Sequence, residues 1–264
     1  MNLSKSKYIL PNLLTLSSVF CGISSIHLSA LAESPGELQI AAWLIVVGML
    51  CDLFDGRVAR MTNAQSAFGV QLDSLADAVS FGVAPALLLY NWGMRPLGMT
   101  GIFIAFIFAA CAIMRLARFN VTAAETGGAS KYFEGLPTPL AAGAIVSMVM
   151  AHLSVTGNAT TNATWNVAAM SILLGALMIS NVRYRTFKDF NFAGRSGVIL
   201  VALCMLVAAV SFFASPAVAF VMIMVLYIII GMGGGLVHLG RNLLGLPDTV
   251  EEPDYLNKPY EEDS

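Results

Sequence analysis

The chain has 264 residues, of which 57% are hydrophobic and 11% charged, and its mean hydropathy is +0.76. These values exclude a soluble domain of this length and predict an all-α integral membrane protein that crosses the bilayer several times. The formal net charge of -2 comes from an acidic C-terminal segment, so we expect no nucleic-acid partner.

Apolar segments of roughly 20 residues, the length that a helix needs to cross a bilayer, predict about eight transmembrane helices. They lie near residues 14–33, 39–60, 68–90, 99–119, 137–155, 165–181, 196–213 and 216–236. We expect residues 1–190 to form a core of six spans and residues 191–240 to add two more. Residues 241–264 are polar, acidic and contain proline, which predicts a disordered tail.

The basic residues predict the orientation of these spans, because lysine and arginine gather in cytoplasmic loops. With the N-terminus inside, Arg95 is the only lysine or arginine expected outside. Both ends of the chain are therefore expected in the cytoplasm. The end of the second span and the start of the third face the same side.

Four aspartates lie where the second span ends and the third begins. Asp52 and Asp55 are three residues apart, and Asp73 and Asp77 are four apart, so each pair shares one face of its helix. The two spans run antiparallel, which allows the pairs to meet just below the cytoplasmic surface. Carboxylates in a membrane span are costly without a partner, and oxygen ligands suit Mg²⁺ or Mn²⁺. The spacing predicts a divalent-metal site.

Small residues and one arginine surround these aspartates. Gly56, Ala59 and Gly69 leave room for a backbone or a ligand, and Arg60 offers a planar cation for phosphate or carboxylate. Close helix packing explains each small residue taken singly, but the full set indicates a groove for a nucleotide diphosphate. A divalent-cation transporter built on the same carboxylates is the alternative from another class of protein.

The pattern Asp52-x2-Asp55-Gly56-x2-Ala59-Arg60-x8-Gly69-x3-Asp73-x3-Asp77 resembles the signature of the CDP-alcohol phosphatidyltransferase family without a gap or substitution. The resemblance implies a six-helix membrane enzyme, often a homodimer, that transfers a phosphatidyl group from a CDP-linked lipid to an alcohol and releases CMP. It implies that Mg²⁺ or Mn²⁺ is held by Asp52, Asp55, Asp73 and Asp77, with Asp77 as the general base. It also implies that CDP lies along Gly56, Ala59, Arg60, Ser66, Gly69 and Asp73.

One further residue near the start of the chain is a candidate for the nucleotide site. Asn12, beside Pro11, either touches the nucleotide or caps the first helix. The family and the topology together imply a bacterial plasma membrane, with the site facing the cytoplasm and membrane lipids around the protein.

Segments outside the aspartate region resemble the phosphatidylserine synthase branch of this family, which implies CDP-diacylglycerol and L-serine as substrates. They are residues 10–16, 115–120, 133–139 and 180–188.

Serine carries a carboxylate and an ammonium group, and the residues of these segments offer a partner for each. Arg115 or Arg118, with Asn120 nearby, suits the carboxylate, and Glu134 suits the ammonium. The alternative interpretation is that the arginines anchor the chain at the membrane surface. The basic residues at 183–188 keep open a phosphorylated acceptor such as glycerol 3-phosphate or inositol phosphate.

Overall fold

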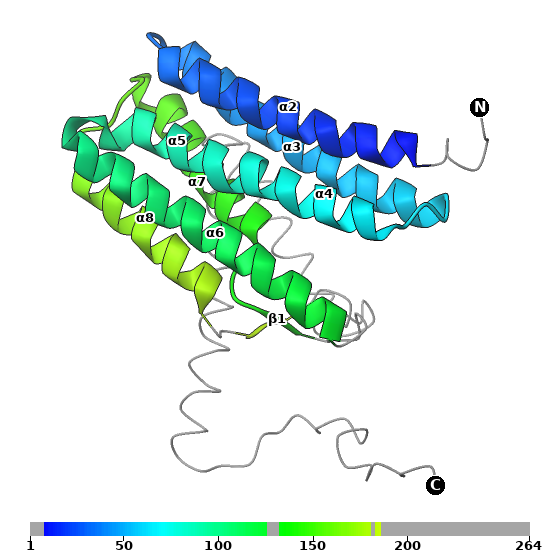
Figure 1. Ribbon diagram of the computed structural model, residues 1–264. Coiled ribbons are helices and arrows are strands. Elements are labelled where there is room, and N and C mark those ends of the chain that lie inside the picture. Colours follow the sequence, from blue (N-terminus) through cyan, green and yellow to red (C-terminus); the bar gives the residue numbers. More distant parts are fainter. Residues whose placement is uncertain (1–7, 126–131, 181–182, 186–264) are drawn as a thin grey trace, which may run out of the picture.

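The computed structural model describes residues 8–125, 132–180 and 183–185 (Figure 1). The predicted seventh and eighth spans and the acidic tail lie outside these residues. The described helices are α2 (Ile9–Leu31), α3 (Pro35–Met61), α4 (Ala67–Asp77), α5 (Ala84–Leu89), α6 (Met99–Glu125), α7 (Thr138–Thr156) and α8 (Thr164–Ile179). Between α4 and α6 the chain also forms η1 (Ala78–Val83), η2 (Tyr90–Met94) and η3 (Arg95–Leu97).

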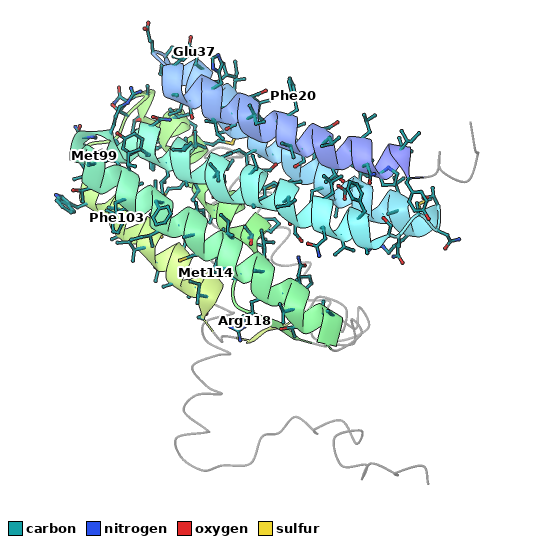
Figure 2. All side chains as sticks on the ribbon, in the orientation of Figure 1. Phe20, Glu37, Met99, Phe103, Met114 and Arg118 are labelled. Carbon is teal, nitrogen blue, oxygen red and sulfur yellow. The ribbon has the colours of Figure 1, made fainter. Side chains whose placement is uncertain are left out.

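Five elements of the described chain are long and apolar enough to cross a membrane. They are Ile9–Leu31, Pro35–Met61, Ala67–Leu97, Met99–Ala124 and Thr138–Thr156, and α8 is a shorter apolar helix of 16 residues. The prediction of an all-α integral membrane protein is thereby confirmed. Large apolar side chains such as Phe20, Met99 and Phe103 point outward from the bundle (Figure 2), as expected where lipid replaces water.

The first helix begins earlier than the sequence predicted. Its N-cap is Tyr8, and the backbone N–H of Asn12 already donates to the Tyr8 carbonyl at 3.3 Å. Pro11 is tolerated there because the first N–H groups of a helix have no partner within it. The alternative that Asn12 caps this helix is therefore wrong, since Asn12 lies inside it.

A short turn, residues 62–66, joins the two aspartate-bearing helices α3 and α4 (Figure 1). Ser66 caps α4 by accepting a hydrogen bond from the Gly69 N–H at 3.0 Å. At its other end α3 starts with a capping box between Ser34 and Glu37. These caps fix the length and the position of both helices.

The third span changes its helical geometry directly after the aspartates. At η1 the chain widens to a π-helical turn, a feature that is often found at functional sites. Gly22 of α2 packs against this turn so closely that an added Cβ would lie 3.0 Å from Ser80 Cα. The missing side chain of Gly22 thus allows α2 to pack against the third span.

The apolar core lies among the third span, α6, α7 and α8, with part of α3. Its largest fully buried side chains include Phe81, Phe108, Leu88 and Ile145. Helix α2 packs along α3 at the edge of this core, and α6 packs along α8 (Figure 1). The ends of α3, α4 and α6 that bear the candidate residues are held in place from within the bundle.

A short antiparallel pair of strands was not predicted. β1 (Tyr132–Glu134) pairs with β2 (Arg183–Arg185), so that Glu134 and Arg183 are opposite each other. Gly135 follows with φ 77° and packs against the Met178 carbonyl, where no side chain fits. The pairing ties the loop before α7 to the chain that follows α8.

Candidate active site

The hairpin of α3 and α4 brings carboxylates together near one end of the bundle. One ligand oxygen each from Asp52, Asp55 and Asp73 lies within 4.8 Å of the others. Asp55 is buried, with 5% of its surface exposed, whereas Asp52 and Asp73 are half-buried. Asp77 lies one turn beyond Asp73, and its carboxyl group lies beside that of Asp52.

This arrangement fits a divalent cation. Three carboxylates at this separation repel one another unless positive charge neutralises them. The donor set consists of oxygen alone, which suits a hard cation such as Mg²⁺ or Mn²⁺. The half-buried members leave one side of the cluster open to a phosphate ligand.

A residue of a third helix holds one of these carboxylates. The hydroxyl of Thr15, in α2, donates a hydrogen bond of 2.6 Å to Asp55 Oδ2, and both residues are buried. The sequence predicted a role for Asn12 in this segment but not for Thr15. The signal was present, because Thr15 follows Asn12 by three residues on an apolar helix and so shares its face.

Few atoms lie near the glycines beside the carboxylate cluster. An added Cβ at Gly56 would meet nothing within 4 Å, and one at Gly69 would meet only Ser66 Oγ, at 3.2 Å. Close packing therefore does not explain Gly56 within the described part of the chain. Ala59 is half-buried one turn away from Asp55. This face of the hairpin stays open for a ligand.

The remaining candidates for the nucleotide site lie at the same end of the bundle. Arg60 is exposed in the last turn of α3, and Ser66 uses its hydroxyl to cap α4. Asn12 is half-buried in the first turns of α2, one turn before Thr15. They come from α2, from the end of α3 and from the turn before α4.

Arg115 is buried close to the carboxylates. Its side chain is 9% exposed, its Nη1 donates to Thr138 Oγ1 at 3.2 Å, and its charge interacts with that of Asp77. The guanidinium carbon lies 6.0 Å from the centre of the Phe119 ring. Its Nε has no hydrogen-bond partner among the residues that the structure describes. A buried cation within electrostatic range of Asp77 therefore keeps one donor without a partner among the described residues.

The other predicted acceptor residues lie in different directions. Arg118 extends along the lower end of α6 in Figure 2, and its Nη1 lies 3.5 Å from the Ile179 carbonyl at the end of α8. Asn120 donates from Nδ2 to Ser74 Oγ at 2.8 Å and so ties α6 to α4. The side chain of Glu134 lies outside the described residues. Arg115 and Arg118 thus do not meet at one point.

The apolar helical bundle defines an integral membrane protein, and its converging aspartates form a carboxylate cluster that fits a divalent cation. Residues 8–179 match the family model described as CDP-alcohol phosphatidyltransferase. The chain belongs to this family of enzymes, whose members use a divalent metal.

Relatives of known name come from bacteria and yeast. The CDP-diacylglycerol–serine O-phosphatidyltransferase of Helicobacter pylori (strain ATCC 700392 / 26695) is 36% identical over 229 residues, which cover 85% of this chain and 90% of that protein. The protein of the same name from Bacillus subtilis (strain 168) is 34% identical over 179 residues, covering 68% of this chain and 91% of its own length. In Saccharomyces cerevisiae (strain ATCC 204508 / S288c) the protein of this name is 42% identical over 152 residues, 56% of this chain and 54% of that protein.

Proposed function

We propose that this protein transfers the phosphatidyl group of CDP-diacylglycerol to the hydroxyl of L-serine and releases CMP. The observation that carries the proposal is the convergence of Asp52, Asp55 and Asp73 within 4.8 Å on one hairpin. The substrates come from the name shared by the two bacterial relatives, which are matched over 90% and 91% of their own length. In this proposal Asp52, Asp55, Asp73 and Asp77 would hold Mg²⁺ or Mn²⁺, which would supply positive charge to neutralise the pyrophosphate and stabilise the leaving CMP.

The nucleotide half of the donor occupies the open face of the hairpin. The absent side chains at Gly56 and Gly69 leave space for CDP beside the carboxylates. Arg60 contacts its phosphate oxygens as a planar donor. Asn12, Ala59, Ser66 and Asp73 complete the contacts with the nucleotide.

Asp77 acts as the general base. It accepts the proton of the serine hydroxyl while that oxygen attacks the lipid-linked phosphorus. The new bond joins the serine oxygen to this phosphorus, and the bond between it and the CMP oxygen breaks. The reaction is a single displacement, and no covalent enzyme intermediate forms.

Arg115 binds the carboxylate of serine. Its electrostatic interaction with Asp77 and the lack of a partner for its Nε among the described residues support this role, because a buried cation needs a partner and a carboxylate provides one. Thr138 holds the guanidinium from the start of α7. Glu134 meets the ammonium group, whereas Arg118 and Asn120, which are directed to α8 and α4, lie outside this contact. This arrangement selects an amino acid over a neutral alcohol.

The setting of the enzyme is part of the same proposal. We infer a homodimer in a bacterial plasma membrane, with residues 1–190 as the catalytic core and the site open to the cytoplasm. The distribution of charge supports this orientation. Arg95 donates to the Ala30 carbonyl at the end of α2, far along the bundle from Arg60 and the aspartates.

An acceptor comparison tests the proposal. CMP release by the purified protein in detergent is measured with CDP-diacylglycerol and Mn²⁺ or Mg²⁺, and serine, glycerol 3-phosphate and inositol phosphate are supplied in turn. Serine alone is expected to drive release, and Asp77→Asn is expected to abolish it. Release with a phosphorylated acceptor instead would keep the family chemistry and refute serine. Metal flux without any CMP release would favour the transporter.

A further inference from the structure

The hydrogen bond between Thr15 of α2 and Asp55 of α3 joins two helices through residues that are 40 positions apart in the sequence. Both side chains are 5% exposed, so water does not compete for the bond. Its length of 2.6 Å is typical of a hydroxyl that donates to an ionised carboxylate. Such bonds are about twice as strong as those between neutral groups.

The hydroxyl of Thr15 has two acceptors in reach but only one proton to donate. Asp55 Oδ2 lies at 2.6 Å, whereas the Pro11 carbonyl lies at 3.1 Å. The shorter distance and the charge both assign the proton to Asp55. A carboxylate has lone pairs for several partners, so this bond orients Asp55 and leaves it able to bind a cation.

Other small hydroxyl residues of α2 differ from Thr15 in what they contact. Ser17, Ser25 and Ser29 donate to the backbone carbonyls of Leu13, Ala41 and Ile26, respectively. Thr15 donates instead to a carboxylate, that of Asp55. The bond from Thr15 therefore orients a carboxylate of the candidate metal site and also joins α2 to α3.

We propose that Thr15 is a positioning residue for the metal site, which fixes the Asp55 carboxylate in the orientation that meets Asp52 and Asp73. This inference rests on the metal site of the proposed function and extends that site to α2. Hydrogen bonds from surrounding residues set the orientation of metal ligands, and their loss typically costs about 10- to 100-fold in metal affinity. Thr15→Val keeps the shape of the side chain and removes the donor.

Binding of Mn²⁺ alone tests the inference without any substrate. The full chain is purified in detergent, and free Mn²⁺ is followed by its electron paramagnetic resonance signal. Thr15→Val is expected to raise the Kd for Mn²⁺ by about 10- to 100-fold. Thr15→Ser, which keeps the hydroxyl, is expected to bind as the wild type does. Ser17→Ala is the matched control, because it removes an exposed hydroxyl of the same helix.

The outcomes separate this inference from the proposed function. Tight Mn²⁺ binding by both the wild type and Thr15→Val would overturn the role of Thr15 and leave the metal site standing. A wild-type protein that binds no Mn²⁺ would overturn both. If Thr15→Val is not recovered as a folded protein, Thr15→Ala takes its place. In activity assays Thr15→Val should need a higher Mn²⁺ concentration for half-maximal activity than the wild type. Its rate at saturating Mn²⁺ should stay close to that of the wild type, a pattern that a general packing defect would not give.

Discussion

Replacement of Arg115 by lysine separates acceptor binding from the rest of the reaction. Lysine keeps the positive charge but loses the planar guanidinium, whose Nη1 bonds to Thr138 and whose Nε faces no described partner. In the proposed complex the lost contact is a charge-assisted hydrogen bond to the serine carboxylate. Hydrogen bonds to charged groups contribute about 1.5–3 kcal/mol, which corresponds to a loss of roughly 10- to 150-fold in kcat/KM for serine.

The assay is the initial rate of CMP release as serine and CDP-diacylglycerol are varied separately. The KM for serine should rise in Arg115→Lys, while the KM for CDP-diacylglycerol should stay at the wild-type value. Arg118→Lys is the matched control, since Arg118 is exposed one turn further along α6 and directed to the end of α8. An unchanged KM for serine in Arg115→Lys, or an equal change for both substrates, would refute the assigned role.

Three further changes probe the carboxylates, the groove and the packing of α2. Asp73→Asn should reduce CMP release by about 100-fold or more, because loss of a residue that merely orients a metal ligand already costs up to about 100-fold in metal affinity. Activity close to wild type would contradict the place of Asp73 among the ligands. Gly56→Ala should not lower the unfolding temperature, because the added Cβ meets nothing within 4 Å and alanine is the better helix former, and it should raise the KM for CDP-diacylglycerol; an unchanged KM would argue against a groove there. Gly22→Leu should lower the stability by about 1–3 kcal/mol through overpacking against Ser80. Thermal unfolding measures this loss, Gly36→Ala is its control in open space, and equal stability of the two variants would contradict the close approach of α2.

Among the described residues the sequence predicted the apolar spans well, because the length of an apolar segment alone decides whether it can cross a membrane. It did not predict the π-helical turn at η1 or the pairing of β1 with β2. Hydropathy averages over a span and is insensitive to one extra residue per turn. The strand pair joins segments separated by two helices, and no local sequence pattern predicts such a contact.

The candidate site was predictable where its residues follow one another on two neighbouring helices. The spacing of the aspartates alone indicated that Asp52, Asp55 and Asp73 converge. Thr15 and Thr138 escaped prediction because their roles depend on how α2 and α7 pack against distant helices. Residues three apart on a helix point about 60° apart, which is enough to direct Arg115 to α7 and Arg118 to α8.

Formation of labelled lipid from labelled serine tests the central claim most directly. The purified protein is supplied with CDP-diacylglycerol, serine and Mn²⁺, and the lipid product is measured together with CMP, with and without a chelator. The account predicts one phosphatidylserine formed for each CMP released, no product in the chelated sample, and recovery when Mn²⁺ is restored. Equal product formation in the presence of the chelator, or CMP release without labelled lipid, would contradict a metal-dependent transfer to serine.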